Sequence, residues 1–383
     1  MNICILSTRY PYQNNMVHVF VKKVVEEWAK AGHRCVVISP VSRIKMLLGK
    51  DLLMPYHEIQ EVSPSIRVDV IRPRYIDFPY LRFQGVSLTQ MSRRISIERA
   101  ILKTQIDFDF IYAHFFPIAT EGWRYAKIHG IPLFVATGES VVKIPSKPFR
   151  DFTVEAFRKD LCGVIAVSTK NKDEAASLGI IDKAKTKVFP NGANLELFKK
   201  HNKAECRNKL GLPRDAFIII CVGQFIERKG QRRVLQALDK LNKEDIKTIF
   251  IGKGTDDFKH PSILFKGTVI NTELPYYLNA SDLFVLPTLH EGCCNAIIEA
   301  LACGLPIVSS DLPFNHDVLN DKNSIMVDPN NIDEIARGIE KVYGSPELAK
   351  DLAEHSYTQG QQLSIKSRSM SILSFIQEKI LEK

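Results

Sequence analysis

The chain has 383 residues, 45% of them hydrophobic, and a formal net charge of +9 at pH 7. This length is sufficient for two domains with separate cores, and the ordinary apolar content excludes a disordered or fibrous protein. No apolar run approaches the roughly 18 residues that a membrane-spanning helix needs. The N-terminal MNICILSTR indicates a first strand and not a signal peptide, so we expect a cytoplasmic protein.

The positive charge is concentrated at the start of the chain. Residues 1–103 contain 16 Lys and Arg against 8 Asp and Glu, a balance of +8. Such a surface can attract anionic lipid, a diphosphate-bearing acceptor or nucleic acid, although a solvated face without a partner has the same composition. Of these we expect an anionic membrane surface and no nucleic acid.

The eight cysteines lie mostly inside apolar runs, without C-x-x-C or Cys/His metal spacing. This pattern predicts small buried hydrophobes in a reducing compartment, and no metal site. One Asp-x-Asp occurs, at 107–109, where it leads into a predicted strand and is interpreted as a turn.

The first half of the chain alternates between apolar runs and helical patterns. A helical stripe over 17–31 ends at Gly32. The runs that predict strands are 3–7, 35–39, 67–71, 110–114, 133–136, 164–167 and 187–189. Alternating βα units imply a mostly parallel sheet covered on both faces.

Two segments of this half do not follow the pattern. Residues 42–60 mix Leu, Ile and Met with Arg43, Lys45 and Lys50, which is typical of an interfacial amphipathic segment or of an ordinary core-covering helix. Residues 71–83 are rich in Arg and aromatic side chains. Our hypothesis is that both segments face a membrane and an acceptor.

His114 ends the predicted strand 110–114, where ligands of α/β sheets bind. A lone His in this position is either catalytic or structural.

The second half repeats the strand and helix alternation. Its predicted strands are 217–222, 248–251, 264–266, 283–286, 307–309 and 325–327. No G-x-G-x-x-G follows its first strand, which argues against dinucleotide redox chemistry. The tail 367–383 has apolar residues at helical spacing and predicts an amphipathic helix.

The stretch 282–311, DLFVLPTLHEGCCNAIIEALACGLPIVSSD, predicts a strand, a loop, a helix and a second strand. The loop carries Glu291, and Glu299 follows eight residues later in the helix. Free amides at a helix N-terminus suit an anion, whereas carboxylates accept hydrogen bonds from hydroxyl groups. A nucleotide-sugar has both kinds of group. Alternatively, Glu299 is a solvated helix residue and Glu291 a partner of the helix dipole.

This stretch resembles the E-x7-E region of the retaining glycosyltransferases of family 4. Further segments agree with the family in the same order, and they are Gly32-His33, GVIAVS at 163–168, PNGANLELF at 190–198, VGQFIERKG at 222–230 and IGKG at 251–254. The resemblance implies an α/β GT-B fold, in which two Rossmann-like domains face each other across a cleft. It also implies an acceptor-side domain over 1–198, a donor-binding domain over 199–365, and a helix over 366–383 that returns to the first domain.

The resemblance suggests a donor site in the second domain. According to the resemblance, Lys229 neutralises the donor diphosphate. Gln224 stands where the family has an Arg, and Arg228 could take the place of that Arg. It implies that the amides of Gly292, Cys293, Cys294 and Asn295 bind the diphosphate, that Gly267, Thr268 and Val269 contact the base, and that Glu299 binds the ribose. Glu291 is expected to bind the donor sugar, and Glu291, His114 and Lys229 are the expected catalytic residues.

On the acceptor side this sequence departs from the family. Asn14 and Asn15 replace a glycine pair, and Asn tolerates positive φ better than most residues. Thr137 and Gly138 stand where many relatives have His-Gly, so Thr137, Glu139 and His114 are alternatives for the task of that His.

The expected function is metal-independent, retaining transfer of a hexosyl group from a nucleoside diphosphate sugar to a hydroxyl acceptor, in cell-surface polysaccharide or glycolipid synthesis. The expected partners are the donor and a polysaccharide or lipid-linked acceptor, with no cofactor, and the expected location is the cytoplasm or the inner face of the cell membrane. Two alternatives remain: a GT-B epimerase or phosphorylase, and a non-catalytic nucleotide-sugar-binding partner of a synthase complex.

Overall fold

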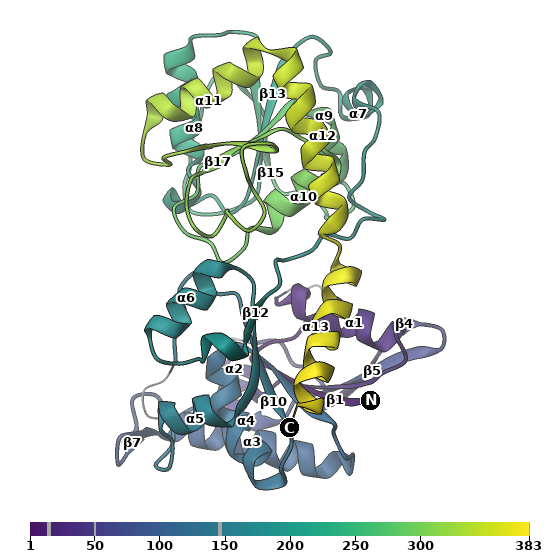
Figure 1. Cartoon of the computed structure of the whole chain (residues 1–383), viewed down its shortest axis with the longest axis vertical. Coiled ribbons are helices and arrows are strands. Elements are labelled where there is room, and N and C mark those ends of the chain that lie inside the picture. The colour runs from purple at the N-terminus through teal and green to yellow at the C-terminus, as the bar shows by residue number, and fades with distance from the viewer. Residues whose placement is uncertain (14–16, 50, 145–147, 383) are drawn as a thin grey trace. The chain divides into compact units, whose positions relative to one another are not determined.

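The computed structural model describes residues 1–13, 17–49, 51–144 and 148–382. They form two compact units, each an α/β layer structure in Figure 1. Unit 1 comprises Met1–Phe189 and Ser369–Lys383, and unit 2 comprises Pro190–Arg368. The expected α/β class with two Rossmann-like sheets is confirmed.

Unit 1 contains a sheet of eight strands, in the order β12-β11-β10-β9-β1-β2-β5-β4. The strands of unit 1 are β1 Asn2–Ser7, β2 Arg34–Ile38, β3 Val41–Ser42, β4 His57–Ser63, β5 Ile66–Ile71, β6 Arg74–Tyr75, β7 Arg82–Phe83, β8 Val86–Ser87, β9 Phe110–His114, β10 Leu133–Thr137, β11 Leu161–Ala166 and β12 Thr186–Val188. Neighbours in the main sheet are parallel except β4, which pairs antiparallel with β5. The predicted strands are therefore found, together with an antiparallel edge strand that was not expected.

The helices of unit 1 cover both faces of this sheet. They are α1 Val19–Lys30, α2 Arg43–Leu47, α3 Leu88–Thr104, α4 Phe116–His129, α5 Val154–Asp160, α6 Thr169–Ser177 and, from Ser369 onward, the C-terminal α13 Ile365–Leu381. Trp28 of α1 donates from Nε1 to the carbonyl oxygen of Ser369 at 2.8 Å, which ties α13 to the face that α1 covers.

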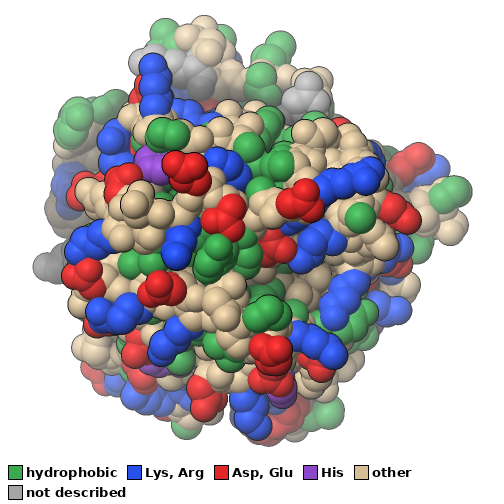
Figure 2. All heavy atoms as spheres, turned by 90° about the horizontal axis from the view of Figure 1, so that it is seen from above, with side chains coloured by type: hydrophobic (Ala, Val, Ile, Leu, Met, Phe, Trp, Pro, Cys, Tyr) green, Lys and Arg blue, Asp and Glu red, His purple; other side chains and the backbone are tan. Residues whose placement is uncertain are grey.

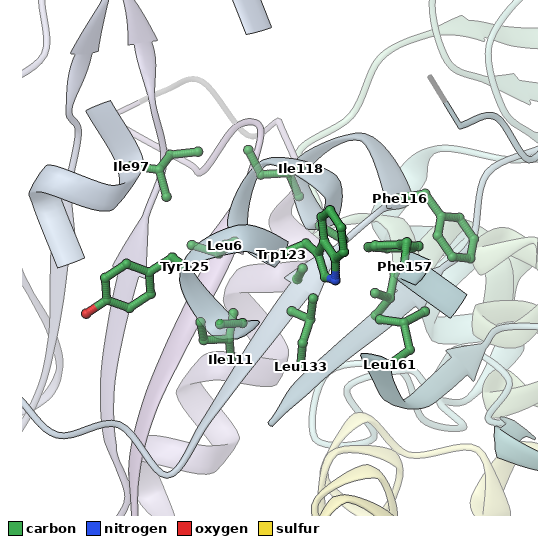
Figure 3. Close-up of a cluster of buried hydrophobic side chains, with 14 of the residues drawn as sticks. Leu6, Ile97, Ile111, Phe116, Ile118, Trp123, Tyr125, Leu133, Phe157 and Leu161 are labelled. Carbon is green, nitrogen blue, oxygen red and sulfur yellow. The ribbon is translucent and has the colours of Figure 1, made fainter. Parts of the chain in front are cut away.

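One core of unit 1 lies between α4 and the centre of the sheet. Ile118, Trp123 and Tyr125 of α4 lie over Leu6, Ile111 and Leu133 of three neighbouring strands (Figure 3). Because side chains alternate along a strand, Phe110 and Tyr112 of β9 point to the opposite face, where both rings pack edge-on against Trp28. This burial on both faces explains the continuous apolar runs of these strands.

The segment 42–60 is not one helix, and this corrects the sequence interpretation. Helix α2 ends at Leu47 and buries none of its residues, so it is not a core-covering helix. Residues His57–Ser63 form strand β4, whose alternating exposed and half-buried side chains suit a sheet edge. An alternating polar edge strand carries no continuous apolar run, so hydrophobicity alone does not reveal it.

Unit 2 contains a fully parallel sheet of six strands, in the order β15-β14-β13-β16-β17-β18. Its strands are β13 Phe217–Val222, β14 Ile246–Ile251, β15 Ile263–Gly267, β16 Leu283–Leu286, β17 Ile307–Ser310 and β18 Ser324–Val327. Its helices are α7 Lys203–Leu210, α8 Gln231–Leu241, α9 Leu274–Ala280, α10 Asn295–Cys303, α11 Ile332–Gly344 and α12 Pro346–Gln362. Figure 1 shows α8 and α11 on one side of the sheet and α9, α10 and α12 on the other.

Surface charge is mixed on the face seen in Figure 2, where Lys and Arg side chains alternate with Asp and Glu. The eight cysteines are all buried and free, as their apolar surroundings in the sequence predict. Among the described residues, no helix has the length and apolar character needed to cross a bilayer.

Candidate functional site

The strand order marks a candidate ligand position at the same point in each sheet. In unit 2 the chain runs outward from β13 on one side and from β16 on the other, so the loops after these two strands diverge. In unit 1 the same reversal occurs between β1 and β9. The crevice outside the carboxyl ends of such a strand pair is where open α/β sheets bind ligands.

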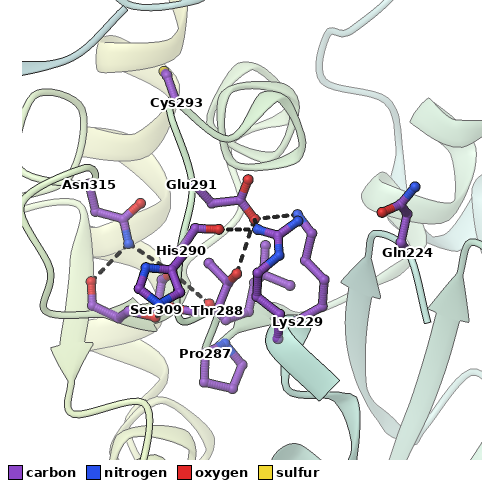
Figure 4. Close-up of polar contacts among 12 residues, drawn as sticks. Gln224, Lys229, Pro287, Thr288, His290, Glu291, Cys293, Ser309 and Asn315 are labelled. Carbon is purple, nitrogen blue, oxygen red and sulfur yellow. Dashed lines mark hydrogen bonds and ion pairs between the residues drawn. The ribbon is translucent and has the colours of Figure 1, made fainter. Parts of the chain in front are cut away.

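In unit 2, two cationic side chains contact the Glu291 carboxylate at this crevice. The loop after β13 forms the short 3₁₀ helix Glu227–Lys229, which supplies Arg228 and Lys229. Lys229 Nζ lies 2.5 Å and Arg228 Nη1 3.0 Å from Glu291 Oε1, in the loop after β16 (Figure 4). The three side chains together carry a net charge of +1, which suits an anionic ligand.

Further hydrogen bonds hold Glu291 and Arg228 in this arrangement. Thr288 Oγ1 donates to Glu291 Oε1 at 3.0 Å, and Arg228 also donates to the carbonyl oxygen of His290. Lys229 is 8% exposed, and burial alone would lower its pKa, but the Glu291 carboxylate, together with Cys294 when that thiol is ionised, outweighs burial and raises the pKa. Burial raises the pKa of Cys294 itself, so its thiol is neutral and Glu291 is the charged partner of Lys229.

Gln224 does not join this cluster. Its side chain is exposed and lies apart from Glu291 in Figure 4, and its backbone carbonyl accepts a hydrogen bond from Gln231 at 2.9 Å. Of the two residues considered for the role of the family Arg, the structure therefore brings Arg228 to Lys229.

The remaining expected donor-site residues surround α10 and β15. Cys294 is the N-cap of α10 in an extended conformation, Gly292 and Cys293 are buried before it, and Asn295 begins the helix. Glu299 is half-buried within α10. Gly267 ends β15, with Thr268 exposed and Val269 half-buried after it.

Asn191, from the PNGANLELF segment, braces the loop before α10. Its Nδ2 donates to the Cys293 carbonyl oxygen at 3.0 Å and to Asn295 Oδ1 at 2.8 Å. The sequence analysis uses this segment only as part of the family resemblance, and it does not single out Thr288. Each acts on a loop whose shape the sequence alone does not specify.

Steric crowding explains why the IGKG segment has a glycine at position 252. Gly252 has φ +153°, and a Cβ built on it would lie 1.9 Å from the carbonyl oxygen of Gly223. The loops after β13 and β14 therefore touch through backbone at a point that has no room for a side chain.

We expect Gly252→Ala to destabilise unit 2 by about 1–3 kcal/mol, because the methyl group forces the loops after β13 and β14 apart. Urea denaturation followed by circular dichroism measures this loss. Gly344→Ala is the matched control, since a Cβ there meets no atom within 4 Å and φ is not positive. Equal stability of the two variants would contradict the steric argument.

In unit 1 the crevice between β1 and β9 holds a group of aromatic and polar residues. His114, at the end of β9, is 5% exposed, and its ring centroid lies 4.9 Å from that of Phe20 and 4.4 Å from that of Phe115. Register places Ser7 opposite His114, and Ser7 Oγ lies 3.3 Å from Nδ1 of His18. His18 was missed in the sequence. Its backbone has φ +58° before α1, and burial lowers the pKa of its ring.

Thr137, Gly138 and Glu139 follow the next strand, β10. Glu139 Oε2 accepts from Thr137 Oγ1 at 2.6 Å and from the Gly138 amide at 3.0 Å, so the carboxylate turns back onto its own strand end. Burial raises the pKa of Glu139 against the opposing effect of these hydrogen bonds. Asn14 and Asn15 lie outside the described residues.

Among the described residues, no group of three or more His, Cys, Asp or Glu side chains is arranged to hold a metal ion. Asp109 of the Asp-x-Asp sequence accepts a hydrogen bond from the Asn2 amide at 2.6 Å, directly before β9.

Solved structures with similar architecture cover the whole chain. A sucrose-phosphate synthase from Thermosynechococcus elongatus aligns over 100% of both chains with a TM-score of 0.76 and 19% identity. HepE from Anabaena, solved in complex with UDP and glucose, aligns over 98% of this chain and 99% of its own, with a TM-score of 0.69 and 16% identity. At these identities the likeness establishes the fold alone.

Relatives in sequence include TuaC of Bacillus subtilis, whose name describes a teichuronic acid biosynthesis glycosyltransferase. It is 29% identical over 360 residues, which span 88% of each chain. An Escherichia coli protein named UDP-Gal:alpha-D-GlcNAc-diphosphoundecaprenol alpha-1,3-galactosyltransferase is 25% identical over 287 residues, 68% of this chain and 72% of its own.

Two family models match consecutive halves of the chain. Residues 17–197 match Glycosyltransferase Family 4, and residues 202–359 match Glycosyl transferases group 1. The family expected from the E-x7-E stretch is thereby confirmed, and the chain belongs to glycosyltransferase family 4, with the GT-B fold.

Proposed function

We propose that the protein transfers a hexosyl group, with retention of anomeric configuration, from a nucleoside diphosphate sugar to a hydroxyl group of a polysaccharide or lipid-linked acceptor. The observation that carries this proposal is the pairing of Arg228 and Lys229 with Glu291 at the crevice of unit 2. Two cations held by one carboxylate leave a positive charge where a diphosphate would bind beside the N-terminus of α10.

Each residue of the cluster has a distinct proposed task. Lys229 and Arg228 stabilise the negative charge that develops on the leaving diphosphate, together with the amides of Gly292–Asn295. Glu291 accepts hydrogen bonds from the hydroxyls of the donor sugar and steadies positive charge at the anomeric carbon. Gly267, Thr268 and Val269 contact the base, and Glu299 accepts from the ribose hydroxyls.

In the proposed reaction the bond between the anomeric carbon and the diphosphate oxygen breaks. The acceptor hydroxyl attacks on the face that the diphosphate leaves, which retains the configuration, and its proton passes to the departing phosphate oxygen. No metal takes part in this proposal, because the positive charge that a metal would supply comes from Arg228 and Lys229. His114, Thr137, Gly138 and Glu139 of unit 1, with Asn14 and Asn15, form the proposed acceptor side.

We further propose that the protein works in the cytoplasm at the inner face of the membrane, in the synthesis of a cell-surface polysaccharide or glycolipid. The names of TuaC and of the galactosyltransferase from Escherichia coli support this setting, since both describe such products or acceptors.

A thermal-shift panel of UDP, GDP, ADP and CMP, with their sugars, tests donor binding. We expect one nucleotide to raise Tm, and Glu299→Ala to weaken its binding by about 10- to 100-fold, because a carboxylate hydrogen bond contributes about 1.5–3 kcal/mol. Glu340→Ala, which replaces a surface carboxylate of α11, is the control. A panel without any shift would contradict nucleotide-sugar transfer, and an unchanged affinity in Glu299→Ala would contradict the ribose assignment.

A further inference from the structure

Exposed apolar side chains are concentrated in one short part of unit 1. Among the described residues, eleven of the twenty exposed large hydrophobic side chains lie between Ile44 and Phe83, in about a tenth of the chain. The most exposed are Leu47 at 79%, Leu53 at 81% and Tyr80 with its whole side chain in solvent. We define the apolar rim as Leu47, Leu48, Leu53, Tyr80, Leu81 and Phe83.

Backbone and side-chain contacts hold together the two segments of the rim, of which the first carries Leu47, Leu48 and Leu53 and the second Tyr80, Leu81 and Phe83. Strand β3, which leads into α2, pairs with β6, which leads toward Tyr80. Ser42 Oγ donates to Asp77 Oδ2, and Arg74 donates to the Met54 carbonyl oxygen. The two segments therefore belong to one surface, although they are separated in sequence by β4 and β5.

The local backbone directs the second segment into solvent. Tyr80 has φ +64°, an uncommon conformation for an aromatic residue. In the hairpin β7-β8 the two loop residues Gln84 and Gly85 have φ +50° and +81°, as a tight two-residue hairpin loop requires. A two-stranded hairpin this short has little stability of its own in water, and strained positions that expose apolar groups are typical of binding surfaces.

The exposed charges beside the rim are mostly basic. Arg43, Lys45 and Arg82 are exposed, whereas the nearby acidic residues Asp51 and Asp77 are half-buried, and Asp77 accepts a hydrogen bond from Ser42. Apolar side chains beside Lys and Arg match the interface of an anionic bilayer, where basic residues are attracted to the lipid head groups and apolar side chains leave water.

The rim also borders a cavity at the carboxyl ends of β1 and β2. This cavity has a volume of about 170 Å³, and Arg9, Lys45, Met54, Tyr75 and Arg93 are among its lining residues. Lys45 stands two residues before Leu47 and Met54 directly follows Leu53, so a molecule held in a bilayer beneath the rim would lie next to the cavity.

We propose that the apolar rim docks unit 1 on an anionic lipid bilayer, from which a lipid-linked acceptor enters this cavity. The inference rests on the proposed function and deepens it by naming the acceptor class and the surface that meets it. The polar head of the acceptor contacts Arg9, Lys45 and Arg93, while Leu47, Leu53, Tyr80 and Phe83 lie among the lipid chains.

Vesicle co-sedimentation of the full chain tests the docking. We expect retention on vesicles of phosphatidylcholine mixed with phosphatidylglycerol, and at least about tenfold weaker retention on phosphatidylcholine alone. The variant Leu47→Ser/Leu53→Ser/Tyr80→Ser/Phe83→Ser should lose at least about tenfold in affinity for the anionic vesicles. The control Ile128→Ser/Ile270→Ser/Leu381→Ser changes three other exposed apolar side chains outside the rim and should bind as the parent does.

Three results would overturn the inference. The first is that the anionic vesicles do not retain the parent protein. The second is that the control variant loses as much vesicle affinity as the rim variant. The third is that light scattering finds a dimer of the parent and a monomer of the rim variant, so that the rim binds a second copy of the chain. The nucleotide shift in Tm, measured on the same variants, separates this inference from the proposed function. Protein that binds nucleotide but not vesicles refutes the docking alone, and protein that binds vesicles but no nucleotide refutes the transfer reaction.

Discussion

Replacing Lys229 with Met is expected to lower kcat by about 10²–10³-fold, the usual effect of removing one preorganised group that stabilises developing negative charge. The Lys229 ammonium is nearly buried and held 2.5 Å from Glu291, so it needs no reorganisation when the diphosphate leaves. Met has a similar length without the charge. Glu291 keeps its contacts with Arg228 and Thr288, so the substitution does not leave a buried carboxylate without a partner.

The measurement is the initial rate of nucleoside diphosphate release with the donor that the thermal-shift panel identifies. Lys240→Met is the control, because Lys240 forms a surface pair with Asp333 and lies outside the cluster. Since the pKa of Lys229 is raised, its charge is constant near neutral pH, and the parent rate should show no titration from this group there. A kcat within about threefold of the parent would contradict the proposed role of Lys229.

The second large effect concerns stability. Arg93→Met is expected to lower the free energy of unfolding of unit 1 by about 3–5 kcal/mol. Arg93 of α3 donates from Nε to Glu121 Oε2 of α4 at 2.6 Å and from Nη2 to Oε1, and Glu121 is fully buried. Removing the guanidinium leaves a buried carboxylate without its cation, which costs more than the loss of an exposed pair.

Both tryptophans, Trp28 and Trp123, lie in unit 1, so their fluorescence in urea reports the unfolding of this unit alone. Lys22→Met breaks the partly exposed pair with Glu26 and should change stability by less than about 1 kcal/mol. The double variant Arg93→Met/Glu121→Leu should recover most of the loss, because it removes the buried charge as well. A loss below about 1 kcal/mol in Arg93→Met would refute the buried-pair argument.

The same pair predicts how the loss depends on pH. Burial raises the pKa of Glu121, and the Arg93 guanidinium opposes this rise. Without Arg93 the pKa rises further, so the variant takes up a proton on Glu121 at a higher pH than the parent does. A raised folded-state pKa means that stability is lost as pH rises through it. The difference between variant and parent should therefore shrink as pH falls through the pKa of Glu121 in the variant.

The strands at the centre of each sheet can be predicted from the sequence. The ranges expected for β9, β13 and β16 coincide with those in the structure, because a parallel strand covered on both faces needs an uninterrupted apolar run. The family and the loop that carries Glu291 were also recognisable, since they depend on residues close together in the chain. The ion pair between Glu291 and Lys229 could not be predicted in this way, because the two residues are far apart in the chain.

Contacts between residues that are distant in the sequence become apparent only in the folded chain. Arg228, and not Gln224, reaches Glu291 because the short 3₁₀ helix Glu227–Lys229 turns it toward the loop after β16. Asn191 braces Cys293 across 102 positions of sequence, and β4 depends on β5 for its backbone partners. Such contacts carry no local signature, since they arise from strand order and register and not from the apolar pattern of any one segment.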